Sequence, residues 1–118
     1  MNFNKASKHC RSMGAILAEP KTEAEHGVVM KYLKSVRSAT LIWLGATDLA
    51  NEGKWLWQSD SQPISYNKWR HGSPATTETY DCLLLGPLTG FFYDMICRAN
   101  TNIEFLCQEK LQGNWFVC

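Results

Sequence analysis

Residues 42–69 have the sequence IWLGATDLANEGKWLWQSDSQPISYNKW, and this stretch is the most informative part of the chain. The stretch begins within an apolar run, residues 41–46, which is typical of a buried strand. An acidic turn follows this run. A Trp-Leu-Trp run at residues 55–57 comes next, before a polar segment that closes on another tryptophan. We expect four tryptophans to be buried and to fix the base of the following segment: Trp43, Trp55, Trp57 and Trp69.

Two helices are expected before this stretch, over residues 3–13 and from Thr22 to about Ser38. The first has apolar residues at helical spacing and is followed by Gly14, a common stop signal. The second begins with a T-x-x-E capping box, in which the side chains of Thr22 and Glu25 accept from free backbone amides. The predicted apolar faces are Phe3, Ala6 and Cys10 in the first helix, and Ala24, Val28, Tyr32 with either Val29 or Leu33 in the second.

Short strands are expected in the rest of the chain. Their predicted bounds are 41–46, 54–57, 82–85, 91–94 and 103–108. The polar residues 59–80 separate the second strand from the third, and a loop of that length in a compact domain is usually functional. Helices followed by strands, without βαβ alternation, indicate the α+β class. With 118 residues, the chain is expected to form one domain, residues 1–118.

The composition excludes several classes of function. A formal net charge of +1, with lysines and arginines scattered along the chain, argues against a nucleic-acid partner. Hydrophobic residues make up 45% of the chain, but no run approaches the roughly 18 residues that span a bilayer. His9, His26 and His71 are the only histidines, and the first two lie on predicted helix surfaces. No nucleophile stands at a known spacing from a base, so we do not expect an enzyme.

Five cysteines in so short a chain indicate an oxidising compartment, and we therefore expect a secreted protein. None of them forms the C-x-x-C pairs that a zinc site requires, which favours disulfides. Because five is odd, one thiol must pair with another chain or stay free.

The chain resembles the C-type lectin-like domains, and in particular the small secreted lectins of invertebrate innate immunity. Ile42–Trp69 matches the family's W-I-G-L, G-x-W-x-W and closing Trp, while the first helix matches W/F-x-x-A-x-x-x-C. Residues 105–108 match the terminal I-C-E strand. The resemblance implies the disulfides Cys10–Cys107 and Cys82–Cys97. It leaves Cys118 as the candidate for an interchain disulfide in a homodimer.

The chain departs from the family pattern at both ends. Family members have a strand before the first helix, which pairs with the terminal strand, and this chain starts at the helix. Residues 109–118 form an extension in which a turn at Gly113 precedes an aromatic, β-branched run. We expect residues 115–117 to fold back along residues 103–107 as a replacement edge strand. The alternative is a disordered tail.

Sugar-binding members use a Ca²⁺ ion that bridges protein oxygens and sugar hydroxyls, and most of its ligands are absent here. Where the family has an E-P-N tripeptide, this chain has Ser-Pro-Ala at residues 73–75. Where the family has a Glu shortly before the loop cysteine, this chain has Tyr80. Tyr93 replaces the Asn of W-N-D, so only Asp94 is retained. Because calcium needs six to eight hard oxygens, the resemblance implies no calcium bridge to sugar and no required cofactor.

An auxiliary calcium site of the family is better preserved. Asp48 and Glu52 match its D-x-x-x-E, and Asp81 matches a third carboxylate, so weak Ca²⁺ binding is expected there. The alternative is that Asp48 and Glu52 cap the turn after the strand or pair with Lys54.

The long loop still carries groups suited to a sugar, namely aromatic faces, hydroxyls and a carboxylate. The candidate ligand-binding residues are Ser73, Thr77, Glu78, Tyr80, Tyr93 and Asp94. The predicted function is therefore a lectin that recognises glycans or a glycoprotein through this loop. The alternative is a protein-binding module that uses the same surface.

Overall fold

The structure is a computed structural model that describes residues 1–70, 81–99, 103–109 and 115–117. Two helices and seven strands confirm the α+β class. The helices are α1 (Phe3–Ser12) and α2 (Glu23–Ser35). The strands are β1 (Ala15–Leu17), β2 (Ile42–Thr47), β3 (Leu56–Trp57), β4 (Cys82–Leu85), β5 (Phe92–Met95), β6 (Glu104–Glu109) and β7 (Trp115–Val117). Neither helix is long and apolar enough within these residues to cross a membrane.

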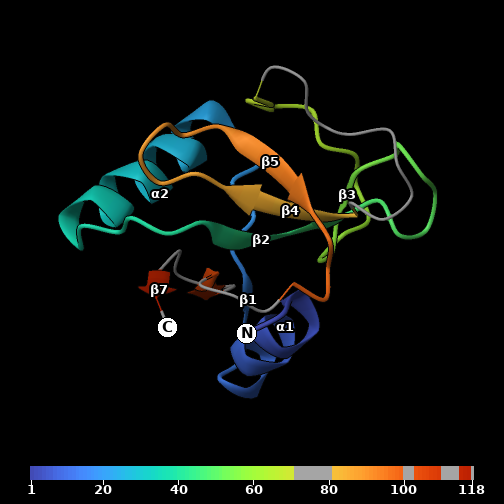
Figure 1. Ribbon diagram of the computed structural model, residues 1–118, viewed down its shortest axis with the longest axis horizontal. Coiled ribbons are helices and arrows are strands. Elements are labelled where there is room, and N and C mark those ends of the chain that lie inside the picture. The colour runs from blue at the N-terminus through green and yellow to red at the C-terminus, as the bar shows by residue number, and fades with distance from the viewer. Residues whose placement is uncertain (71–80, 100–102, 110–114, 118) are drawn as a thin grey trace.

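One sheet runs through the molecule in the order β1-β6-β2-β4-β5, with β3 paired to β2 and β7 paired to β6. The pairing of β2 with β6 is parallel, whereas β2 with β4 and β4 with β5 are antiparallel. In Figure 1, α1 lies at the bottom of the view, below β2, and α2 lies at the upper left. The turn that joins β4 to β5 lies beside α2, away from the segment that follows β2.

The alternation of side chains along β2 creates two cores. Ile42, Leu44 and Ala46 face the core that contains Val29 of α2, together with Trp55 and Trp57. Trp43 faces the other core, where its ring meets Phe3 of α1 edge to face at 5.7 Å. Successive residues of a strand point to opposite faces, so one apolar run serves both cores. Of the four tryptophans, Trp69 is only partly buried.

Both expected disulfides are present and confirm the pairing that the resemblance implied. Cys10 of α1 is joined to Cys107 of β6, across 97 residues of sequence. Cys82 of β4 is joined to Cys97, just after β5, across 15 residues. The first disulfide holds α1 to the sheet, and the second holds together the two strands that precede and follow the β4–β5 turn.

Strand β7 pairs antiparallel with β6, with Cys107 opposite Phe116. The described backbone therefore contains the hairpin partner that the sequence suggested. The role of this strand as a replacement for the family's first strand stays a prediction. Cys118 lies outside the described residues.

Helix α2 is turned relative to the predicted phase. The structure confirms the capping box of Thr22 and Glu25. The buried side chains, however, are His26, Val29 and Leu33, while Val28 is 50% exposed. The predicted face was therefore right for Val29, Leu33 and the partly buried Tyr32, and wrong for Ala24 and Val28. Two adjacent valines fit either phase, and the histidine was taken as a surface residue.

His26 is a buried residue, so its predicted surface position was wrong. It is 6% exposed, and its Nε2 donates to the carbonyl oxygen of Gly90 at 2.9 Å. Its ring also contacts Tyr66 and Phe92, with ring centroids 5.6 and 5.9 Å away. The hydrogen bond fixes the β4–β5 turn against α2.

Stability should fall as the pH drops below about 6.5. Burial lowers the pKa of His26 from its ordinary value of 6.5, Lys68 lowers it further, and the Gly90 carbonyl and Glu23 oppose the shift. The unfolded chain therefore takes up a proton first, so stability present above 6.5 is lost as the pH falls towards the lower folded pKa. Urea midpoints between pH 7.5 and 5.5 should fall more steeply in the wild type than in His26→Gln, which keeps a donor for Gly90. Parallel pH profiles would contradict this assignment.

Gly45 has no room for a side chain. A Cβ there would lie 3.0 Å from the carbonyl oxygen of Leu17 and 3.0 Å from Cγ of Glu19. Gly45→Ala should lower the free energy of unfolding by about 2 kcal/mol, because overpacking forces the backbone apart. The matched control is Gly27→Ala on the exposed face of α2, where a Cβ would have no atom within 4 Å. It should stabilise the domain by roughly 1 kcal/mol through helix propensity, so urea unfolding curves should shift in opposite directions.

Candidate functional site

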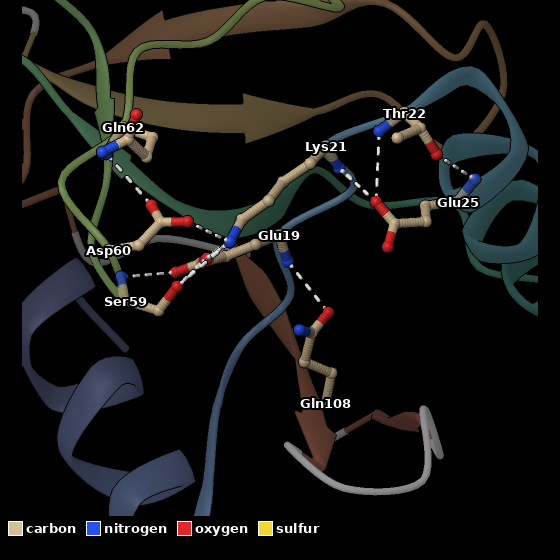
Figure 2. A network of polar contacts seen from close by, with 8 residues as sticks. All are labelled: Glu19, Lys21, Thr22, Glu25, Ser59, Asp60, Gln62 and Gln108. Atoms are coloured by element: carbon tan, nitrogen blue, oxygen red, sulfur yellow. Dashed lines mark hydrogen bonds and ion pairs between the residues drawn. The ribbon is translucent and has the colours of Figure 1, made fainter.

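A buried carboxylate anchors the beginning of the long polar segment. Glu19 is 2% exposed and accepts from the backbone amide of Ser59 at 3.0 Å and from its hydroxyl at 2.6 Å. Lys21 lies 3.3 Å from Glu19 and 2.7 Å from Asp60, and Gln108 of β6 accepts from the Glu19 amide. Figure 2 shows the Glu19 carboxylate between Ser59 and Lys21. This network fixes the start of residues 59–80 to the sheet.

The predicted auxiliary metal residues form one cluster. Asp48 follows directly after β2, and its backbone amide donates to the carbonyl oxygen of Asp81 at 3.1 Å. One carboxylate oxygen each from Asp48, Glu52 and Asp81 lies within 4.8 Å of the others. Asp48 also accepts from the Gly53 amide at 2.8 Å, so it caps the turn as well. The turn-capping alternative and the cluster are therefore compatible.

The electrostatics of this cluster suit a hard cation. Desolvation and the negative charge of Asp48, with hydrogen bonds to Asp48 and Asp81, raise the pKa of Glu52 to about 7. Asp48 is 2% exposed, and its Oδ1 has no hydrogen-bond partner in the described part of the chain. A divalent cation would relieve both the repulsion and the missing contact. The three carboxylates fit Ca²⁺ chemistry but supply only part of the six to eight oxygens that it takes.

Strand β5 presents the remaining described candidates. Tyr93 is half-buried, and its ring lies against Gly86, where an added Cβ would come within 2.8 Å of Cε1. The guanidinium carbon of Arg70 lies 5.7 Å from the centre of that ring. Asp94 is paired in the ladder with Leu83 of β4. Arg70 thus stands beside Tyr93 at the point where the long segment approaches β5.

A small hollow of about 210 Å³ adjoins the carboxylate cluster. It is lined by Leu49, Asp81, Ile96, Cys97 and Arg98. Leu49 is 59% exposed, so its apolar side chain is accessible at the surface beside the cluster. The same end of the sheet therefore offers an acidic cluster, an apolar contact and a cation.

The structure brings together part of the predicted site. Asp48, Glu52 and Asp81 meet as one group, and Tyr93 and Asp94 are neighbours on β5. Arg70 and Leu49 were not predicted as site residues, because no local pattern distinguishes them from surface residues. The pairing of β4 with β5 and the path of the long segment bring Arg70 near Tyr93 and Leu49 near Asp81. The predicted ligand residues Ser73, Thr77, Glu78 and Tyr80 lie outside the described residues.

Comparison with known proteins identifies the family. The family model described as "Lectin C-type domain" matches residues 1–109. A perlucin-like protein of Mytilus galloprovincialis is 37% identical over 108 residues, which are 90% of this chain and 69% of that protein. Tetranectin of Homo sapiens is 33% identical over 111 residues, which are 90% of this chain and 54% of tetranectin. The chain thus spans only about half of tetranectin.

Among solved structures, the mouse scavenger receptor C-type lectin carbohydrate-recognition domain is similar in fold and sequence. Its TM-score is 0.77 at 26% identity, over 90% of this chain and 78% of that one.

Proposed function

Because the chain belongs to the C-type lectin domain family, we propose that it is a carbohydrate-binding lectin that holds its glycan without a calcium bridge. The proposed glycan surface combines the described Arg70, Tyr93 and Asp94 with residues 73–80. The domain acts as a binding module rather than an enzyme. The name of the mouse relative, a carbohydrate-recognition domain, supports the ligand class.

The pairing of Arg70 with Tyr93 carries this proposal. Residue 93 stands where sugar-binding members place an amide oxygen on the bridging calcium, and a phenol is a poor substitute for it. A Ca²⁺ ion there would also face the Arg70 guanidinium, 5.7 Å from the tyrosine ring. The same two groups suit direct recognition, because an aromatic face packs on the apolar side of a sugar and a guanidinium offers five hydrogen-bond donors.

We assign any calcium to the cluster of Asp48, Glu52 and Asp81, where it would hold the loops without touching the sugar. Calcium that binds only the folded state should raise the temperature of thermal unfolding in a concentration-dependent way. Asp48→Asn keeps the shape of the side chain but loses a charge, so it should abolish this rise. An equal rise in both proteins would contradict the assignment.

The decisive experiment is a glycan array run in calcium and again in EDTA. Retention of the same glycans in both buffers would support the proposal, whereas loss in EDTA would show that calcium is required for binding. Arg70→Gln should weaken glycan binding by about tenfold, since a hydrogen bond to a charged group is lost. The matched control is Arg11→Gln on α1, whose side chain contacts Ser7 and which should bind like the wild type.

The apolar hollow supports a second candidate function, recognition of a protein. Leu49 and Ile96 could receive an apolar side chain of a partner, with Arg98 at the rim. Binding to a glycoprotein that persists after its enzymatic deglycosylation, and that Leu49→Asp weakens, would favour this candidate. Binding that disappears with the glycans would favour the lectin.

The two disulfides support secretion, since such bonds persist in oxidising compartments. A role in innate immunity accords with a secreted lectin of this type. We also propose that Cys118 links two copies, which would raise avidity for repeated glycans. A non-reducing gel that shows only monomer would refute the linked dimer.

A further inference from the structure

A second surface, distinct from the carboxylate cluster, lies between α2 and the β4–β5 turn. It is a groove of about 620 Å³, within the range of small-molecule pockets. Its apolar part comes from Met30 of α2 and from Pro87 and Leu88 of the turn. Leu88 is 79% exposed, the most exposed of the large apolar side chains in the described part of the chain. The hydrogen bond from His26 to Gly90 holds the turn in place, so the groove is a fixed feature of the fold.

The other part of the groove is cationic. Lys31 and Lys34 of α2 and Arg37 after it line the same space. No aspartate or glutamate is among the described residues that line it. The domain as a whole has a net charge of only +1, so this is a local concentration of positive charge. An apolar cavity with cations on one side fits a ligand that has an apolar body and an anionic end.

Arg37 occupies a backbone position that favours glycine. Its φ is +54°, and the amides of Arg37 and Ser38 donate to the carbonyl oxygens of Lys34 and Leu33. These two bonds form the Schellman motif that ends α2, with Arg37 at the residue normally occupied by glycine. A left-handed backbone is unfavourable for a residue with a side chain, and this strained position places Arg37 at the groove. Such strain is commonly found at functional positions.

The groove is distinct from the carboxylate cluster. Arg37 precedes β2, and Asp48 follows it. The six residues of β2 span roughly 20 Å, so the groove and the cluster lie at opposite ends of this strand. The proposed glycan surface lies nearer, because the ring of Tyr93 lies against Gly86, beside Pro87 of the groove. Binding at the groove is therefore measured in the absence of glycan.

We propose that this groove binds a single-chain anionic amphiphile, namely a long-chain carboxylate whose alkyl chain lies along Met30 and Leu88. Its carboxylate lies among Lys31, Lys34 and Arg37. A peptide partner is the less suitable occupant, because a stable protein interface needs about 800 Å² from each side and the groove is a pocket beside one helix.

The test uses the whole chain and a fluorescent probe, 11-(dansylamino)undecanoate, displaced by fatty acids below their critical micelle concentrations. Dodecanoate should displace the probe, and affinity should rise about fourfold for each added methylene until the groove is filled. Methyl dodecanoate, which lacks the charge, should bind at least fivefold more weakly. Added salt should weaken binding of the acid and leave that of the ester unchanged.

Two variants separate ligand binding from folding. Leu88→Asp puts a negative charge on an exposed position of the groove and should weaken dodecanoate binding at least tenfold. Its matched control, Val28→Asp, changes an exposed residue of α2 that does not line the groove and should bind like the wild type. Arg37→Gly should weaken binding about fivefold and yet raise the temperature of unfolding by about 2–5 °C, because the strain is relieved. Arg37→Lys should retain binding.

Several results would overturn the proposal. Equal affinity for dodecanoate and its methyl ester would remove the role of the cations. Equal losses in Leu88→Asp and Val28→Asp would place binding elsewhere. Displacement of the probe by a glutamate-rich peptide at lower concentration than by dodecanoate would identify an acidic peptide as the occupant. Failure of dodecanoate to displace the probe from the wild type would exclude the amphiphile.

Discussion

Replacing Cys10 and Cys107 together by alanine is expected to lower the free energy of unfolding by about 4.7 kcal/mol, the largest effect that we predict for this domain. The two residues are 97 positions apart, so their bond removes much of the freedom of the unfolded chain. Cys10 on α1 and Cys107 on β6 are both fully buried, so the bond lies in the core that α1 forms with the sheet. Guanidinium unfolding of the wild type and the double variant, followed by tryptophan fluorescence, measures the difference.

The second disulfide provides the matched control. Cys82 and Cys97 are 15 positions apart, and removing that bond should cost about 3 kcal/mol. Each double variant loses one disulfide, so the difference between the two losses reports the length of the loop that each bond closes. Equal losses would show that local packing, rather than loop closure, dominates the stabilisation.

Glu19→Ala is expected to lower the free energy of unfolding by about 3 kcal/mol, the largest effect among the single substitutions. The substitution removes two hydrogen bonds to a buried carboxylate, each worth about 1.5–3 kcal/mol before the relief of desolvation. It leaves the amide and hydroxyl of Ser59 without the Glu19 acceptor, so the start of the long segment should loosen. Glycan binding should weaken with it, because the segment leads to the proposed ligand residues. Urea unfolding and the glycan array measure the two effects.

Asp60→Ala tests whether the burial of Glu19 is the reason for the large effect of Glu19→Ala. Asp60 contacts the same lysine, Lys21, at 2.7 Å, but its side chain is 41% exposed, against 1% for Glu19. A surface ion pair of this kind contributes less than about 1 kcal/mol. If Asp60→Ala and Glu19→Ala destabilised the protein equally, the lysine would be the common cause and the buried carboxylate would have no special role.

Much of the fold was predictable from the sequence because its signals are local. The T-x-x-E at Thr22 begins α2 as expected, and the apolar run before Asp48 forms β2. Strand β1 was not predicted, because its three residues are too few to show an alternating pattern. Its formation depends on pairing with β6, about 90 residues away in the chain, as the contact of Leu17 with Cys107 shows.

The candidate site was predictable only where its residues are close in sequence or match a motif of a known family. Asp48 and Glu52 are four residues apart, and their association with Asp81 followed the family pattern. The proximity of Arg70 to Tyr93 depends on the route of the chain between β3 and β5, which no spacing rule records. The phase of α2, too, is decided by packing: His26 is buried because the Gly90 carbonyl satisfies it there.

The position of β6 in the sheet has a consequence for biosynthesis. Strand β6 lies between β1 and β2 in the sheet. An amino-terminal portion emerging from the ribosome therefore has no partner for β1, whereas β2 can pair with β3 and β4 first. The sheet is complete only after β6 has been synthesised, and Cys10 must wait for Cys107 while Cys82 and Cys97 appear earlier. Before Cys107 emerges, a nascent Cys10 can pair with Cys82 instead, and thiol–disulfide exchange must then restore the native bond.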